Sequence, residues 1–501
     1  MENKKRRTDP EFSGTGLEHR DNASTRNLPP EILSLIVEFF HAWNEWETLQ
    51  KISLVDRNWK AAAQARLFMR VEIDNGQECK FWNRKFKDFP HLGRYVRQLC
   101  LSDDDDCLGR AYLRTRTAKT LISSLPCVTG LDLVDIKRWG PVEARLVKGL
   151  SRSVRTLWVT DIRGMCRVKD LPDLLFSFPN VDDFTPGEIG DGYDEGNLEH
   201  TRNTGLEMRE LAPRDGKART LRTITLLNVG LSVDHLLWLT GPAFDLSGLR
   251  SLTLAWSCFD SLDSCDFKAL DDFISLIGRS VTSLTLNIPG SRVYRLSQVP
   301  SVRAYNPEDL VTEHLVSSPA LQHFTALETV AFNMLEDDKS YNDSFASNLF
   351  VCNTKFMLQA TSGSACHLKK LNLTSRYRYG RFYLGFTVNA TLNLGWNLFD
   401  DMLADDKAFP SLQLVVLDVI VEPAAYPERR FPTWTEFSEG IRGQLSKTIS
   451  KRTVKVILVD GDEGERLAIP NGTGVLTADT QSSAGSGTVQ ASSAQAAPVL
   501  E

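Results

Sequence analysis

The sequence predicts an α/β fold in which strand–helix units repeat along the chain behind a short helical segment. Three observations lead to this prediction: an apolar stripe at helical period near the start, a recurring strand-like apolar motif, and helix-like segments between its copies. The predicted boundaries are a disordered tail at 1–26, a three-helix segment at 27–70, a connecting segment at 71–95, the repeated units at 96–465 and a disordered low-complexity tail at 466–501.

The three-helix segment begins at two prolines. Pro29 and Pro30 suit a first helical turn, which does not use their missing amide donors. The residues that follow at spacings of three and four, one apolar helix face, are Ile32, Leu33, Ile36, Val37 and Phe40. A helical segment of about forty residues buries too little surface to be stable alone. We therefore expect a partner to cover its exposed apolar face.

This segment resembles the F-box family, whose usual pattern is Leu-Pro-x-Glu, an aliphatic helix, Val-Cys-x-x-Trp and a closing Leu-Phe or Leu-Trp. The matching residues are Leu28-Pro29-Pro30-Glu31, Val55 with Trp59, and Leu67-Phe68, while Asp56 stands where the family often carries Cys. The resemblance implies that the surface bound by a Skp-type adaptor consists of Leu28, Pro29, Ile32, Leu33, Ile36, Leu54, Val55 and Trp59. The alternative is an ordinary helical cap on the repeats behind it.

A motif of the form aliphatic-x-x-aliphatic-x-aliphatic recurs behind the helical segment. Its copies are Val96/Leu99/Leu101, Val128/Leu131/Leu133, Val154/Leu157/Val159, Leu221/Ile224/Leu226, Leu249/Leu252/Leu254, Val281/Leu284/Leu286, Leu327/Val330/Phe332, Leu368/Leu371/Leu373, Leu414/Leu417/Val419 and Val454/Ile457/Val459. A weaker copy spans Val181 to Phe184, where Asp182 and Asp183 interrupt it. Steps of roughly 26 to about 46 residues make these units irregular beside compact leucine-rich repeats of about 20 to 29.

Helix-like segments lie between the motif copies. They are Ala118–Leu125, Val142–Leu150, Leu171–Phe176, Asp234–Leu239, Phe267–Ile277 and Asn397–Leu403. A helix after each strand covers its apolar face and returns the chain for the next parallel strand, so stacked units give a solenoid. The pattern resembles the degenerate leucine-rich repeats behind F-boxes in many fungal proteins, over roughly Val96 to Val459. A doubly wound α/β domain is the competing interpretation, but no Gly-rich phosphate loop follows any strand core.

Composition limits the classes of partner. The net charge of −6 argues against a nucleic-acid surface, which needs an excess of Lys and Arg. No apolar run approaches the roughly eighteen residues that cross a bilayer, so we expect no membrane partner. The nine cysteines form no Cys-x-x-Cys pair and no secretory leader precedes them, which predicts reduced thiols in the cytoplasm, the nucleus or both.

No residues in the sequence suggest chemistry of the chain's own. Neither a Gly-x-Ser-x-Gly elbow nor a Gly-Lys-Ser/Thr phosphate loop is present, and we name no catalytic residue, metal ligand or cofactor. One basic and aromatic patch directly after the motif copy Leu371/Leu373 is a candidate for contact with a target protein, because Arg and Tyr are frequent at interface hot spots. It comprises Arg376, Tyr377, Arg378, Tyr379, Arg381 and Tyr383. An exposed hairpin that packs on the next unit explains the patch equally well.

Taken with the resemblance, these patterns imply a non-enzymatic substrate-recognition subunit of a Skp–cullin–F-box ubiquitin ligase. It would bind the adaptor, and through it a cullin–RING complex, with the F-box, and an unknown target with the repeats. Two alternatives stay open. One is an F-box scaffold that acts with the adaptor outside a ligase, and the other is an α/β enzyme with an unrecognised site.

Overall fold

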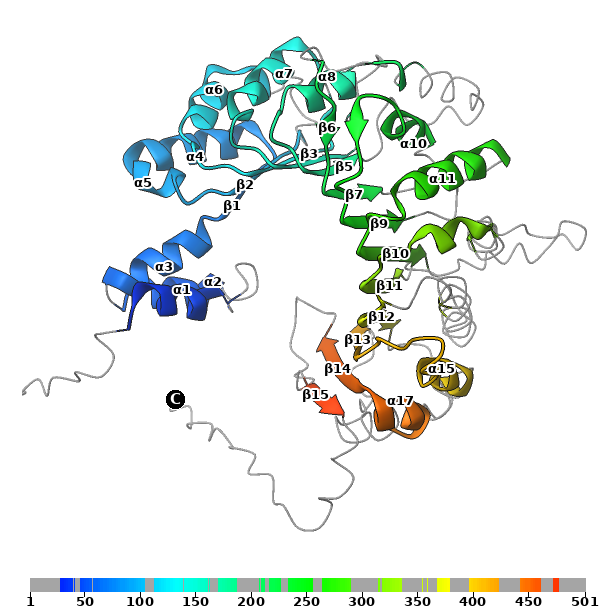
Figure 1. Ribbon diagram of the computed structural model, residues 1–501. Coiled ribbons are helices and arrows are strands. Elements are labelled where there is room, and N and C mark those ends of the chain that lie inside the picture. Colours follow the sequence, from blue (N-terminus) through cyan, green and yellow to red (C-terminus); the bar gives the residue numbers. More distant parts are fainter. Residues whose placement is uncertain are drawn as a thin grey trace, which may run out of the picture. The chain divides into compact units, whose positions relative to one another are not determined.

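The computed structural model contains two compact units, an N-terminal unit (Met1–Met69) and a sheet unit (Arg70–Glu501). Figure 1 shows the helices and strands of both units. The residues described are 28–38, 40, 46–55, 57–103, 112–137, 139–160, 162, 170–186, 207, 209–211, 216–226, 233–255, 264–289, 314, 315, 318–335, 354, 358, 367–378, 396–422, 442–460 and 472–476. The predicted tail at 1–26 and Asp56 lie outside them, as does most of the tail at 466–501.

Three short helices form the described part of the N-terminal unit: α1 (Pro30–Glu38), α2 (Trp46–Ile52) and α3 (Arg57–Leu67). Helix α1 begins at Pro30, as the sequence predicts, and the carbonyl oxygen of Pro29 accepts hydrogen bonds from the first turn. Both α1 and α2 contact α3. The side chains buried in this unit are Leu33, Val37, Leu49 and Ala63.

The sheet unit is built on one thirteen-stranded sheet. Its strands are β1 (Arg70–Ile73), β2 (Gln98–Leu101), β3 (Gly130–Val134), β4 (Thr156–Thr160), β5 (Asp183–Pro186), β7 (Thr223–Leu226), β9 (Ser251–Ala255), β10 (Ser283–Pro289), β11 (Thr329–Leu335), β12 (Lys370–Arg378), β13 (Leu414–Glu422), β14 (Thr453–Asp460) and β15 (Gly472–Leu476). A separate parallel pair consists of β6 (Arg219–Thr220) and β8 (Phe244–Asp245).

The strands lie in the sheet in the same order as in the chain. Among the described strands of this sheet, all neighbours from β1 to β14 are parallel, and only β15 is antiparallel. A doubly wound sheet reverses its order at a switch point, and the described strands show no such reversal. The α/β architecture is therefore confirmed, and its strand order is compatible with a repeat solenoid.

Helices connect the strands of the sheet unit. They are α4 (Gly76–Asp88), α5 (Pro90–Gly93), α6 (Arg116–Ser123), α7 (Pro141–Val147), α8 (Asp170–Phe176), α10 (Val233–Leu239), α11 (Ser264–Ile277), α15 (Trp396–Leu403) and α17 (Ser446–Lys451), with 3₁₀ turns at Tyr112–Arg114, Lys148–Leu150 and Pro319–His323. Successive helices contact one another at α4–α6, α6–α7, α10–α11 and α15–α17, forming a layer beside the strands (Figure 1). All six helices predicted from the sequence are present.

One row of apolar side chains runs across the sheet and explains why the units stack. Cross-strand pairing places them in register from β1 to β14, and none is more than 1% exposed. The row consists of Val71, Leu99, Leu131, Leu157, Phe184, Ile224, Leu252, Leu284, Val330, Leu371, Val415 and Val454. Because each member packs against the same position of its neighbours, every unit completes the core of the next.

The entrances of the strands are joined by a repeated hydrogen-bond pattern. From Arg97 to Lys369, one carbonyl oxygen per unit accepts from two successive N–H groups of the next unit, at 2.7–3.1 Å. These acceptors are Arg97, Thr129, Arg155, Asp182, Arg222, Arg250, Thr282, Glu328 and Lys369. These bonds satisfy backbone N–H and C=O groups at the point where the chain turns into each strand. The same bonds recur in each of these units, although the segments between the strands differ in length.

The repeat starts earlier than the sequence predicted. Residues 71–95, expected to be a connecting segment, contain β1, α4 and α5. Strand β1 pairs in parallel with β2, so that Val71 and Ile73 lie opposite Leu99 and Leu101. Strand β1 was not predicted, because only two of its four residues, Val71 and Ile73, are aliphatic.

The last two motif copies were predicted at shifted positions. In β13 the residues equivalent to Leu371 and Leu373 are Val415 and Leu417, two residues before the predicted Leu417 and Val419. In β14 they are Val454 and Val456, whereas the predicted Ile457 pairs with Asp418 on the opposite face. Both strands contain consecutive aliphatic residues, so that the motif can be fitted at more than one position and only packing selects one.

The predicted disordered tail at 466–501 contains a strand. Strand β15 pairs in antiparallel fashion with β14 and covers one edge of the sheet. An edge strand offers unpaired N–H and C=O groups to any extended segment, and this pairing requires no apolar pattern. Composition alone therefore could not reveal it.

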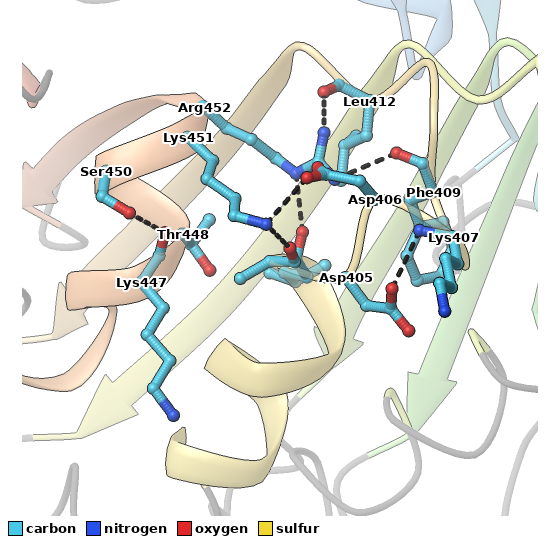
Figure 2. A network of polar contacts seen from close by, with 12 residues as sticks. Asp405, Asp406, Lys407, Phe409, Leu412, Lys447, Thr448, Ser450, Lys451 and Arg452 are labelled. Atoms are coloured by element: carbon cyan, nitrogen blue, oxygen red, sulfur yellow. Dashed lines mark hydrogen bonds and ion pairs between the residues drawn. The ribbon is translucent and has the colours of Figure 1, made fainter.

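The unit that ends in β14 is fastened to its neighbour by a buried polar network (Figure 2). The guanidinium of Arg452 donates to the carbonyl oxygens of Leu403 (2.6 Å), Phe409 (3.0 Å) and Leu412. In the same unit the Asp400 carboxylate accepts from the N–H of Thr448 at 2.7 Å, near the start of α17. Polar contacts thus supplement apolar packing where the repeat approaches its last strand.

Candidate docking surface

The described N-terminal helices separate a small core from a large exposed apolar set. On α1, Leu33 and Val37 are one turn apart and buried, while Ile32 and Leu35 are exposed. Ile32 is 41% exposed, although an isoleucine on a helix of a closed domain is normally covered. Helix α1 therefore presents apolar side chains to solvent beside the face that it packs on α3.

The turn after α2 is the most exposed apolar part of the unit. Leu54 is 84% and Val55 65% exposed. Their N–H groups donate to the carbonyl oxygens of Lys51 and Ile52 at 3.0 and 3.1 Å, so this turn has a defined backbone. A hydrogen-bonded turn that holds two aliphatic side chains in water is suited to insertion into a partner.

The exposed apolar set is concentrated in this part of the chain. Six of the eleven large apolar side chains that are exposed among the described residues lie between Leu28 and Val55. The set consists of Leu28, Ile32, Leu35, Trp46, Leu54 and Val55. A soluble domain that left so much apolar surface open would be prone to association, and a partner is the physical way to cover it.

The structure divides the eight predicted adaptor-binding residues into three groups. Leu28, Pro29, Ile32, Leu54 and Val55 are exposed, and Ile36 and Trp59 are half-buried. Leu33, at 2% exposed, packs inside the three helices and offers almost no surface to a partner. Helical period alone could not make this distinction, because Leu33 lies beside the exposed Ile32 in one continuous stripe.

Two members of the exposed apolar set were not predicted as site residues. Leu35 lies one turn after Ile32 on α1, and Trp46 is the first residue of α2. The spacing from Ile32 to Leu35 was a usable signal, since residues three apart share a helix face.

The predicted target-binding patch is described only in part. Arg376, Tyr377 and Arg378 form the end of β12, where they pair with Ile420, Val421 and Glu422 of β13. Tyr379, Arg381 and Tyr383 lie outside the described residues. The first half of the patch is therefore strand rather than loop.

Two buried thiols of the sheet unit are poor nucleophiles. Burial raises the pKa of Cys79 to about 11. Burial, together with the carboxylates of Asp132 and Glu72, raises that of Cys100 to about 12. Since the thiolate is the reactive form, both remain unreactive near neutral pH.

The described residues contain no group of three His, Cys, Asp or Glu side chains placed to hold a metal ion. None of the described helices has both the length and the apolar character needed to span a bilayer.

The chain matches no protein-family model and no curated protein sequence. Among solved structures it is similar to a chain in the crystal structure of the Rad7 and Elc1 complex in yeast. The similarity covers 80% of this chain and 90% of that chain, with 10% sequence identity and a TM-score of 0.31. So distant a similarity identifies neither family nor function, and function must be inferred from the residues of this chain.

Proposed function

We propose that the chain is the substrate-recognition subunit of a Skp–cullin–F-box ubiquitin ligase. The observation that carries this proposal is the exposed apolar set of the N-terminal unit. It overlaps the positions that the F-box resemblance assigns to the adaptor: Leu28, Ile32, Leu54 and Val55 belong to both sets, and the predicted Pro29 is exposed as well. Packing geometry and sequence pattern thus support the same surface by separate routes.

Adaptor binding would be driven by removing this apolar set from water. Full burial of a Leu or Ile side chain contributes about 1.5–3 kcal/mol, so the exposed side chains of α1 and the α2–α3 turn supply a substantial driving force. Part of that energy offsets the entropy lost on association. Leu54 and Ile32, both strongly exposed aliphatic residues, are the natural anchors.

In the proposed function the stacked sheet unit holds the target. Each unit is locked to its neighbours by the apolar row and by the paired hydrogen bonds at the strand entrances. A stiff support keeps a bound target lysine near the ubiquitin-conjugating enzyme recruited by the cullin–RING complex. The chain would accelerate transfer by proximity, with the chemistry supplied by that enzyme.

Co-purification tests this function. The full chain, expressed with a tag while the proteasome is inhibited, should capture both a Skp-type adaptor and a cullin. The double variant Ile32→Asp and Trp59→Ala should lose both. The control variant Leu276→Asp places the same charge at an exposed leucine of α11 and should retain both.

Two outcomes contradict the proposal. Capture of the adaptor without a cullin would identify a scaffold outside a ligase. Capture that survives the double variant would show that the adaptor binds elsewhere on the chain.

A further inference from the structure

The face of the sheet that points away from the apolar row carries an exposed tryptophan. Cross-strand pairing places Glu72, Cys100, Asp132, Trp158 and Thr185 in one line over β1 to β5. Alternate strand residues share a face, so these side chains all lie opposite to the buried row. Trp158 is 41% exposed, whereas the equivalent positions on β2, β3 and β5 are buried.

This part of the sheet face has an excess of negative charge. The outward strand positions of β1 to β5, all described, include the carboxylates of Glu72, Asp132 and Asp183 and only one cation, Arg70. Arg70 lies 2.8 Å from Glu72 and 3.9 Å from Asp132, so its charge is already shared. Asp183 is paired across the strands with Thr156, which lies two residues before Trp158 on the same face of β4.

Asp132 is incompletely neutralised. Its side chain is 3% exposed, and Gln98 Nε2 donates to Oδ2 at 2.8 Å. Oδ1 is buried and has no hydrogen-bond partner among the described residues. Burial raises the pKa of Asp132 despite Gln98 and Arg70, and burial also raises that of Asp183. A further positive charge near these carboxylates would stabilise their ionised forms.

An indole between two carboxylates is the arrangement that recognises a cation. The ring face attracts an ammonium or guanidinium group within about 6 Å of its centroid, and nearby carboxylates strengthen the attraction. A guanidinium group fits best, because it is planar and weakly hydrated and can stack on the ring. Trp158 is the exposed member of this otherwise buried line on β2 to β5, which suits contact with a side chain presented by another protein.

We propose that Trp158, flanked by Asp132 and Asp183, binds an arginine side chain of a partner protein. Trp158 provides the stacking surface and Asp183 a half-buried carboxylate beside it. Asp132, the buried cross-strand neighbour of Trp158 on β3, contributes negative charge beside it. The proposal extends the proposed function by naming a chemical feature of the target. It rests on the proposed function in one respect, that the partner protein is called the target. The binding itself requires no adaptor.

Fluorescence anisotropy with the full chain tests the site. The probe is a labelled peptide of alternating glycine and arginine, and the matched peptide carries citrulline, which has the same shape without the charge. The arginine peptide should bind and the citrulline peptide should not. Trp158→Leu, which keeps an apolar side chain but removes the ring, should weaken binding roughly five- to tenfold, and Trp158→Phe should weaken it less.

Carboxylate variants complete the test. Asp183→Asn should weaken binding, whereas Asp272→Asn, at an exposed position of α11, should not. The proposal is overturned if the arginine peptide does not bind, if the citrulline peptide binds equally well, or if Trp158→Leu binds like the original chain. None of these results would bear on the adaptor, which is absent from the measurement.

Discussion

His235 is a buried histidine on α10 whose Nδ1 atom finds no hydrogen-bond partner in the part of the chain that the structure describes. Burial lowers its pKa from 6.5 to about 4. Between these two pH values His235 is therefore protonated in the unfolded chain and neutral in the folded chain. Stability is fully present above pH 6.5 and declines as the pH falls toward 4, by about 1.4 kcal/mol per pH unit within that window.

The variant His235→Leu isolates this contribution. Removing the titrating ring should flatten the pH dependence of the free energy of unfolding between pH 4 and 6.5. Urea denaturation of the original chain and the variant across this range measures the difference. Parallel curves for the two proteins would contradict the assignment.

Arg452 adds buried hydrogen bonds to the apolar packing of the last parallel unit. Its guanidinium satisfies the carbonyl oxygens of Leu403, Phe409 and Leu412 (Figure 2). The variant Arg452→Lys keeps the positive charge, but a lysine side chain cannot donate to all three of these carbonyl oxygens. Leaving two buried carbonyl groups unpaired should destabilise this unit by about 2–4 kcal/mol, measured as faster amide hydrogen exchange in β13 and β14.

Lys451 provides the matched control for Arg452. It lies next to Arg452 and also contacts Asp406, at 2.7 Å, but both of these side chains are largely exposed. Lys451→Gln should therefore have a clearly smaller effect than Arg452→Lys. Equal effects would show that burial of the Arg452 bonds is unimportant.

At the scale of elements, α4 belongs to the first strand–helix unit and has a well-defined start. The Asn75 side chain accepts hydrogen bonds from the N–H groups of Gln77 and Glu78, both at 3.0 Å. The Glu78 carboxylate accepts in turn from the N–H of Asp74 at 2.8 Å. These contacts join the end of β1 to the helix, and they satisfy donors that a helix start leaves unpaired.

The variant Asn75→Ala should destabilise this unit by about 1 kcal/mol, the usual contribution of an N-cap side chain. Hydrogen exchange of α4 measures the effect locally. The exposed Gln77→Ala on the same helix is the control and should leave exchange unchanged. Equal exchange in the two variants would contradict the role of the cap.

Most elements could be predicted from the sequence because their apolar periods are unambiguous. Copies such as Leu131/Leu133 alternate cleanly with polar residues, and the helices between them show helical spacing. The exact positions of the motif in β13 and β14 could not be predicted, because both strands contain consecutive aliphatic residues, such as Leu414 to Leu417. The motif can be fitted at more than one position in such a run, and only the register with the neighbouring strand decides.

The candidate docking surface was predicted less completely than the fold. The proline start and the stripe of α1 located the segment, but a stripe does not reveal which of its members point inward. Leu33 and Ile32 were assigned to one surface, and packing on α3 separates them. Trp158 was not predicted as a site residue, because the motif Leu157/Val159 indicates only the buried positions of β4.

At the scale of the whole molecule, the strand order predicts local rather than global responses. Within the thirteen-stranded sheet, each described strand pairs only with the strands before and after it in the sheet order, so a defect in one unit should spread only to the adjacent units. Leu252→Ala opens a cavity in β9 and should cost about 2–5 kcal/mol. Amide exchange should accelerate in β7, β9 and β10 and remain unchanged in β2 and β3.

The exposed Leu276→Ala on α11 serves as the control for this cavity and should leave exchange unaltered. A uniform rise in exchange over the whole sheet unit after Leu252→Ala would instead indicate one indivisible core.

The most direct test of the central claim is the affinity of a purified Skp-type adaptor for the full chain, measured by calorimetry. Leu54→Asp places a charge on the most exposed residue of the apolar set, where it cannot disturb the core. It should weaken binding at least about tenfold, whereas Leu276→Asp should bind like the original chain. Unchanged affinity in Leu54→Asp, or no binding by the original chain, would contradict the claim that the N-terminal helices form an adaptor-docking surface.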